Sequence, residues 1–369
     1  MDRISEISLY RCPVRLKVPF VISLGRLDFA DNIIVTIRTS QGLTGFGECS
    51  PFLTIHGESG ETCMAIGKLI AGRIAGMDPE KIGDIHRIMN AVVYGNTSVK
   101  SAIDIALHDI AATRRGMPLY AFLGGTNRQL LTDYTVSIGD AEKMAADARK
   151  IMDEGFAFIK VKLGGTPAED LKRMTAIREA VGNQIPVRID ANQAWDAEDA
   201  IEILKKLRDY NIEHCEEPIS RQRFLSLPRI TQASAIPLMA DESCFDEEDA
   251  LRLAEIGACQ LFNIKLGKSS GFYRALKIIA IAEKHGIFLQ AGGFLESRLG
   301  FTATAHLALS HSNFRFFDFD TPLMLSEDFV EGGIRYESGG RVNVPEASGL
   351  GACVSAEKLK ELNRLTVTV

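Results

Sequence analysis

The chain has 369 residues, 24% of them charged, and a formal net charge of −6. This acidic balance argues against a nucleic-acid partner, because proteins that bind nucleic acid usually present a basic face. The N-terminal MDRISEISLY carries charges where a signal peptide needs an apolar core, and we find no apolar run long enough to cross a bilayer. The seven cysteines are scattered without metal-ligand spacing, which predicts free thiols in a reducing cytoplasm.

The first third of the chain predicts an α+β domain over residues 1–125. Residues from about 4 to 50 alternate in the manner of antiparallel strands, with a turn at Ser40-Gln41-Gly42. Residues from about 60 to 120 have apolar side chains at helical spacing, and the last of these helices is expected to end at Gly116, before Pro118. Strands followed by helices make an α+β unit.

From about residue 130 short apolar runs recur at regular intervals, with helical segments such as AEDLKRMTAIREAVG between them. The runs are LTDYTVSI, FAFIKVKL, VRIDAN, IEHCEEP, PLMADES, QLFNIKL, IFLQAGG and FRFFDFD. About eight alternations of strand and helix predict a closed (β/α) barrel over residues 126–325. An open doubly wound sheet is the alternative, disfavoured because no glycine-rich dinucleotide loop follows the first strand. Residues 326–369 lack this rhythm and are expected to pack back on the N-terminal domain.

The run FIKVKL places two lysines two positions apart on one strand. Because strand side chains alternate between faces, Lys160 and Lys162 point the same way as Phe158, and the apolar residues between them point the other way. Lysine is rarely buried without a partner. The pattern therefore raises the question of which partner or function requires two adjacent ammonium groups.

Polar residues end nearly every predicted barrel strand, where barrel enzymes place their catalytic groups. Asp190, Glu216 and Asp241 come from three adjacent strands, and three carboxylates converging on one point suit Mg²⁺. Taken singly, each acid is more simply a salt-bridge or helix-cap residue; taken together, they favour a metal. His214 shares the strand face of Glu216, Glu217 points to the opposite face, and periodicity does not say which face is inside.

Lys162 and Lys265 end the second and sixth predicted strands, across the barrel mouth from each other. A single lysine there is more simply a surface side chain. Both lie in apolar sequence, however, where desolvation is expected to lower the pKa of a lysine towards that of a usable base. Two opposed bases suit removal of a proton from one face of a carbon and its return on the other. Lys160 would lower the pKa of Lys162 further and help to hold a substrate carboxylate.

These motifs carry a family resemblance over nearly the whole chain. The motifs are KVK at 160–162, DAN at 190–192, EEP at 216–218, ADES at 240–243, NIKLGK at 263–268 and GFGECSP at 45–51. The sequence resembles the enolase superfamily, in its muconate-lactonising-type subgroup. The resemblance implies a modified (β/α)8 barrel with an α+β capping domain and one Mg²⁺ per subunit. It also implies lysine acid/base catalysts and electrostatic support from Asn192.

Within the subgroup the chain is similar to dipeptide epimerases of the Ala-Glu type, through Asp318 and Asp320 in DFDTPLML. Two carboxylates would repel a dianionic substrate such as muconate and attract the ammonium group of a dipeptide. An extended dipeptide spans roughly 7 Å, enough to reach from the metal to the last strand. The resemblance also assigns Thr135 and, more loosely, Glu296 to the substrate pocket.

One position departs from the pattern of the Ala-Glu enzymes. Their mobile capping loop supplies an arginine to the glutamate side chain, and that place falls on Gly25 here, with Arg26 adjacent. Without that cation, apolar neighbours such as Phe20 and Ile22 would favour a small or hydrophobic second residue. Arg26 could instead restore the contact through a one-residue shift.

The sequence therefore predicts a cytoplasmic, Mg²⁺-dependent dipeptide epimerase, expected to be a homo-oligomer, that acts on Ala-X dipeptides with X such as Ala, Val or Met. By family likeness, Lys162 faces the α-proton of the L-isomer and Lys265 that of the D-isomer. The alternatives are an L-Ala-D/L-Glu epimerase, an N-acylamino-acid racemase and an o-succinylbenzoate synthase; the two aspartates of the last strand argue against the latter two. The alternative that is not an enzyme is an inactive metal-binding barrel.

Overall fold

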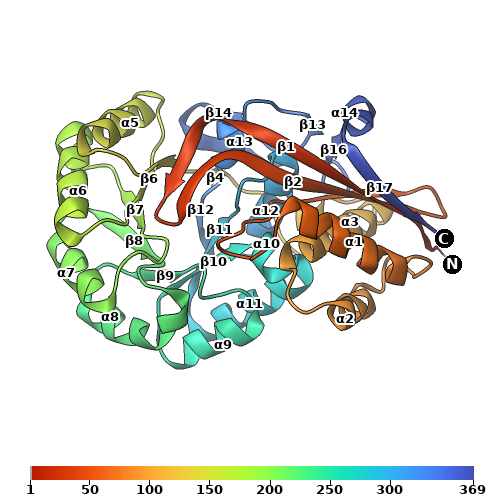
Figure 1. Cartoon of the computed structure of the whole chain (residues 1–369), viewed down its shortest axis with the longest axis horizontal. Coiled ribbons are helices and arrows are strands. Elements are labelled where there is room, and N and C mark those ends of the chain that lie inside the picture. The colour runs from red at the N-terminus through yellow and green to blue at the C-terminus, as the bar shows by residue number, and fades with distance from the viewer. Residues whose placement is uncertain (1) are drawn as a thin grey trace.

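The computed structural model describes residues 2–369 and consists of a capping domain packed on a barrel (Figure 1). The capping domain holds a four-stranded antiparallel sheet in the order β17-β1-β2-β3. Its strands and helices from the N-terminal part are β1 (Ile4–Ile22), β2 (Gly25–Thr39), β3 (Thr44–Cys49), α1 (Gly60–Ile74), α2 (Ile82–Val92), α3 (Thr97–Arg114) and α4 (Leu119–Phe122). The predicted order of strands before helices is confirmed.

Two glycines of β3 let helix α3 lie directly on the sheet. A side chain at Gly45 or Gly47 would overlap the main-chain carbonyl oxygen of Ala106 or Ala102 on α3. The sequence TGFGEC therefore fixes the close approach that buries the apolar face of α3 against the sheet.

Each of the eight predicted apolar runs contributes one strand to a single parallel sheet that follows chain order, so the barrel prediction is confirmed. The strands are β5 (Tyr134–Val136), β6 (Ile159–Lys162), β7 (Val187–Asp190), β8 (Ile212–Glu216), β9 (Leu238–Ala240), β10 (Leu261–Lys265), β11 (Phe288–Gly292) and β12 (Phe314–Phe317). The helices and the 3-10 segment η1 that go with them are α5 (Ala141–Asp153), α6 (Pro167–Val181), α7 (Ala197–Leu207), η1 (Arg221–Ser226), α8 (Leu227–Ala233), α9 (Glu247–Glu255), α10 (Leu266–Ser269), α11 (Phe272–His285), α12 (Arg298–Ser310) and α13 (Thr321–Met324).

Local sequence sets the helix starts around the barrel. Helix α6 begins with a reciprocal capping box between Thr166 and Glu169, and Pro167 occupies its first turn. Helix α12 begins at Arg298 and is capped by Ser297, whose hydroxyl accepts from the Leu299 amide. These caps fix where each helix leaves the loop that carries site residues.

The sheet closes where the beginning of β5 meets the end of β12. The Asp133 amide donates to the Phe317 carbonyl oxygen at 3.3 Å, and the Phe319 amide donates to Thr132 Oγ1 at 2.8 Å. Strands of a barrel are staggered, so the register slips along the axis on going round. As a result, residues that precede the first strand lie beside residues that follow the last.

The remaining segments depart partly from expectation. The first apolar run does not form a single strand. Its first residue belongs to β4 (Leu130–Leu131), which pairs with β15 (Arg341–Asn343) in a separate sheet that also contains β14 (Arg335–Glu337). The C-terminal elements are β13 (Val330–Gly332), β14 (Arg335–Glu337), η2 (Ser338–Gly340), β15 (Arg341–Asn343), β16 (Ala352–Val354), α14 (Ala356–Glu361) and β17 (Asn363–Thr368). Strand β17 pairs with β1, which brings the two chain ends side by side (Figure 1).

A buried ion-pair cluster joins the capping domain to the barrel. Asp104 on α3 accepts from His86 at 2.6 Å and from the main-chain amide of Phe272, at the start of α11, at 2.5 Å. It also lies 3.2 Å from His108. Burial opposes ionisation of Asp104, but His108 and His86 hold its pKa below the usual range; the Asp104 charge in turn raises the pKa of His108 against the effect of burial.

Replacing Asp104 with Asn is expected to destabilise the protein by about 3–5 kcal/mol, because it breaks a buried pair. Because the pKa of His108 is raised in the folded state, its contribution to stability is complete below about pH 6.5, its unfolded-state pKa, and is lost as the pH rises through the folded-state pKa. Because the pKa of Asp104 is lowered in the folded state, its contribution to stability is lost only at acid pH. Urea unfolding should therefore show a larger difference from native at about pH 5.5 than at about pH 8.5. Asp84→Asn, at an exposed pair with Arg87, is the control; an equal loss from both variants would contradict this assignment.

Candidate active site

The three predicted metal-binding carboxylates lie at the ends of adjacent barrel strands. Asp190 is directly opposite Glu216 in the β7–β8 ladder, and Asp241 follows β9; all three are fully buried. The Lys160 ammonium lies 3.2 Å from Asp190 Oδ2 and 2.8 Å from Glu216 Oε2. Glu216 and Asp241 both act on Lys265 and raise its pKa. The three carboxylates therefore face one small region at the barrel mouth.

This donor set fits a hard divalent cation. The carboxylates of Asp190 and Glu216 repel each other, as do those of Asp190 and Asp241, and a shared dication would offset that repulsion. The Asn263 side-chain amide donates to Glu216 Oε1 at 2.8 Å, and Lys268 lies 2.7 Å from Asp241 Oδ1. These neighbours hold the carboxylates in position from the side away from the cavity.

The two predicted acid/base lysines stand on opposite sides of the carboxylates. Lys162 Nζ is 2.6 Å from Asp190 Oδ2, and Lys265 Nζ is 2.6 Å from Asp241 Oδ2. Their strands, β6 and β10, are four positions apart in an eight-stranded barrel, so they face each other across the mouth. Each ammonium also lies over a phenyl ring: Lys162 over Phe20 at 5.8 Å, and Lys265 over Phe294 at 4.8 Å.

The expected lowering of a lysine pKa by the apolar surroundings is wrong for Lys265. Burial acts in that direction, but the charges of Asp241 and Glu216 outweigh it and raise the pKa above its usual value. Lys160 behaves in the same way, because Asp318, Glu216 and Asp190 surround its ammonium. The sequence could not reveal this, since every carboxylate concerned comes from a distant strand.

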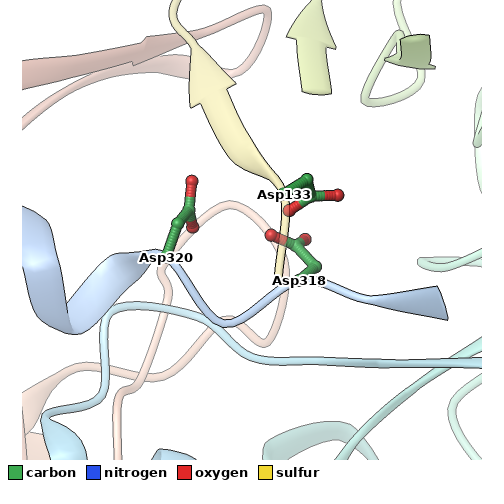
Figure 2. Close-up of side chains that lie close together, drawn as sticks. All are labelled: Asp133, Asp318 and Asp320. Atoms are coloured by element: carbon green, nitrogen blue, oxygen red, sulfur yellow. The ribbon is translucent and has the colours of Figure 1, made fainter. Parts of the chain in front are cut away.

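The aspartate pair of the last strand meets a third acid that the sequence analysis missed. Asp318 Oδ2 pairs with Lys160 at 2.7 Å, and Asp320 Oδ2 accepts from the Thr135 main-chain amide at 2.7 Å. Asp133, just before β5, approaches from the other side of the seam (Figure 2). One carboxylate oxygen from each of the three lies within 4.8 Å of the others, close enough to surround a cation. Burial and the Asp318 charge raise the pKa of Asp320 to about 7.

The other predicted site residues divide into two groups. The predicted site residues that line a common cavity are Thr135, Lys160, Lys162, Asn192, Lys265, Asp318 and Asp320. The buried carboxylates Asp190, Glu216 and Asp241 contact the cavity-lining lysines without lining the cavity themselves, and Glu296 and Gly25 do not line it. The Glu296 side chain turns back to accept from the Phe294 amide at 2.5 Å.

Gly25 is exposed at the tip of the β1–β2 turn, with φ of 139°, where a side chain would be strained. Arg26 next to it is largely exposed and pairs with Asp28 at 2.9 Å. Neither position therefore supplies a cation to the cavity.

The capping domain supplies an apolar wall that the sequence assigned only in part. Two loops cover the barrel mouth, and the first is tied to it by a hydrogen bond from Ser23 Oγ to the Asn192 carbonyl oxygen at 2.8 Å. The apolar cavity-lining residues are Phe20, Ile22, Phe52, Ile55, Phe294 and Leu295. Among residues 2–369, the only cations that line the cavity are Lys160, Lys162 and Lys265.

Comparison with known proteins agrees with this fold. Residues 5–124 match the N-terminal domain of the mandelate racemase / muconate lactonizing enzyme family, and residues 143–358 match the enolase C-terminal domain-like family. The chain therefore belongs to the enolase superfamily, as the sequence motifs predict.

Several characterised relatives share nearly the full length. A D-Ala-D/L-Ala epimerase of Cytophaga hutchinsonii is 52% identical, over 99% of both chains. A crystal structure of a dipeptide epimerase from that organism, complexed with Mg and D-Ala-L-Val, has a TM-score of 0.98 at 51% identity and covers 99% of this chain and 100% of its own. An L-Ala-D/L-Glu epimerase of Bacillus subtilis is 38% identical over 95% of this chain and 96% of its own.

Within residues 2–369 no helix has the length and apolar character needed to cross a membrane.

Removing one charge from any predicted metal ligand should weaken Mg²⁺ binding, because a neutral amide loses the main attraction to the ion. We expect Asp190→Asn, Glu216→Gln and Asp241→Asn each to raise the Mg²⁺ dissociation constant by about tenfold or more in calorimetric titration. Chelator should remove activity, and Mg²⁺ should restore it. Asp199→Asn, a half-buried position in the first turn of α7 and outside the cavity, is the matched control. Native-like Mg²⁺ affinity in all three variants would contradict the assignment.

Proposed function

We propose that this protein is a Mg²⁺-dependent dipeptide epimerase that inverts the α-carbon of the C-terminal residue. The observation that carries the proposal is the pair Lys162 and Lys265 on opposite sides of three carboxylates, with a second acidic cluster at the far end of one cavity. The Cytophaga hutchinsonii relative, a dipeptide epimerase complexed with Mg and a dipeptide, supports it.

Asp190, Glu216 and Asp241 would hold the Mg²⁺ ion. When bound, the ion supplies stabilisation of the negative charge that builds up on the substrate carboxylate as the α-proton leaves. One lysine Nζ, in its neutral form, takes that proton, and the protonated Nζ of the other lysine gives a proton to the opposite face of the carbon. By family likeness Lys162 works on the L-isomer and Lys265 on the D-isomer.

The cap keeps water away from this exchange. The rings of Phe20 and Phe294 lie over the two ammonium groups and leave little room for solvent beside them. A proton taken by one lysine is then delivered to the carbon more readily than to bulk water.

The opposite end of the cavity suits the free N-terminus of the dipeptide. Asp318 and Asp320 reach the cavity, and an ammonium group offsets their charge. An N-acylamino acid or a succinylbenzoate precursor has no such cation, which disfavours both alternatives. Lys160, paired with Asp318 and Glu216, links the two ends and contributes positive charge near the substrate carboxylate.

The second residue of the dipeptide would be small or hydrophobic. Its side chain meets the apolar wall built by Phe20, Ile22 and Ile55. A glutamate side chain would be buried there without a partner, which is costly, and this distinguishes the proposal from the Ala-Glu activity named for the Bacillus subtilis relative.

The two lysines should show opposite defects. Lys162→Ala should abolish exchange of the α-proton with deuterated water from the L-residue, and Lys265→Ala from the D-residue, measured by NMR on Ala-Ala. Both should abolish epimerisation, while exposed Lys206→Ala on α7 should not. Epimerisation by either active-site variant within about tenfold of native would refute the two-base assignment.

The enzyme should require a free N-terminus on the dipeptide substrate, and this requirement should be stronger at higher pH. Because the pKa of Asp320 is raised to about 7, its carboxylate loses the charge that attracts an ammonium group as the pH falls through that value. The kcat/KM of Ala-Ala should therefore drop below about pH 7, and the preference over N-acetyl-Ala-Ala, worth about 1.5–3 kcal/mol, should narrow. Asp320→Asn should remove most of this pH dependence. Equal use of both substrates at every pH would favour an acylamino-acid racemase.

Ala-Ala, Ala-Val and Ala-Met should exceed Ala-Glu in kcat/KM, by up to about 0.8 kcal/mol for each buried methylene. Arg26→Ala should leave the order unchanged, because Arg26 is exposed and paired with Asp28. A native preference for Ala-Glu that Arg26→Ala abolishes would show that the loop rearranges to bring Arg26 to the substrate.

A further inference from the structure

Asp133 is a fully buried carboxylate that the mechanism above does not use. It precedes β5, yet it lies beside Asp318 and Asp320 because the barrel seam places the start of the first strand next to the end of the last (Figure 2). Its Oδ2 accepts from Arg188 at 2.8 Å. Its Oδ1 has no hydrogen-bond partner within residues 2–369. Asp133 does not line the cavity, so any effect on the substrate acts through the charges around it.

Arg188 is held rigidly behind the acidic cluster. This guanidinium, on β7, lies between the rings of Phe158 at 4.5 Å and Phe316 at 5.2 Å. Besides Asp133 it pairs with Glu213 at 2.8 Å, and it donates to the Phe317 carbonyl oxygen at 3.1 Å. Because Arg188 is 2% exposed, its positive charge must be balanced by neighbouring side chains rather than by water.

The charges at this end do not balance without a bound cation. Two buried cations, Lys160 and Arg188, contact the acidic cluster of Asp133, Asp318 and Asp320. Lys160 pairs with Asp318, and Arg188 pairs with Asp133. Each cation is shared: Lys160 also contacts Asp190 and Glu216, and Arg188 also contacts Glu213. Burial, followed by the Asp318 charge, raises the pKa of Asp133, and the Arg188 charge opposes that rise by favouring the ionised carboxylate.

We infer that Asp133 is a positioning residue that determines specificity for a free, cationic N-terminus. By neutralising Arg188, it prevents that fixed guanidinium from cancelling the attraction of Asp318 and Asp320 for the substrate ammonium. The inference rests on the proposed function and adds to it a residue that touches neither substrate nor metal.

The test compares Ala-Ala with N-acetyl-Ala-Ala in the holoenzyme. Asp133→Asn keeps the shape of the side chain and leaves Glu213 as the one carboxylate paired with Arg188 among residues 2–369. The KM of Ala-Ala should rise about tenfold with little change in kcat, while the KM of the acetylated substrate stays within about twofold of native. Glu213→Gln also takes a carboxylate from Arg188, but from a side chain that is 25% exposed, where solvent and salt screen the charge, so it should change the ratio of the two KM values by less than Asp133→Asn does.

The double variant Asp133→Asn/Arg188→Gln removes both members of the pair and restores the charge balance. Its ratio of the two KM values should return to within about threefold of native, whereas a purely structural role for Asp133 predicts a loss at least as large as in the single variant. If Asp133→Asn does not fold, as judged by circular dichroism, the double variant decides alone: a native-like ratio supports the inference and a lost preference overturns it.

The inference and the proposed function fail in different ways. An unchanged ratio in folded Asp133→Asn, or equal kcat losses on both substrates, would overturn the role of Asp133 while native dipeptide epimerisation stands. Absence of α-proton exchange on any dipeptide by the native enzyme would overturn both.

Discussion

The site depends on one buried ammonium group. Lys160 is 1% exposed, and its Nζ faces Asp318, Glu216 and Asp190 at once. An uncompensated buried charge would cost several kcal/mol, so this lysine and its acids must be placed together or not at all. It joins the carboxylates of the proposed metal site to those of the proposed ammonium site.

The register of the barrel strands determines how the side chains of the candidate site are arranged around Lys160. Lys162, Asp190 and Glu216 occupy one row across β6, β7 and β8, and Lys160 and Arg188 are paired in the row below. Going round the barrel from the seam, the acidic cluster comes first, then the proposed base Lys162 on β6 and then the proposed metal ligands. The second base, Lys265, comes from the opposite wall, which is what inversion at a carbon requires.

The capping domain decides what fits between these groups. It places Phe20 over Lys162, whereas the ring over Lys265, Phe294, comes from the barrel, and it leaves no further cation at the cavity among residues 2–369. The Asp104 cluster and Glu48 hold it on the barrel. Glu48 accepts from the Ser297 amide and hydroxyl at 3.0 and 2.7 Å, at the start of α12. The groups proposed for proton transfer thus come from the barrel strands. The groups proposed to select the substrate come from the capping domain and from the seam between β5 and β12.

The sequence by itself determined the barrel, the strands that compose it and the residues at their C-terminal ends, because strand alternation and motif spacing are local properties. Lys160 and Lys162 could be placed on one strand face from these alone, whereas the direction of the face that carries Glu216 could not be decided. Tertiary structure decided three further features, which depend on how the segments pack. They are the raised pKa of Lys265, the orientation of the Glu296 side chain away from the cavity and the exposure of Gly25. Asp133 was missed because it stands at the start of a strand, and only the stagger of a closed barrel brings that end to the active face.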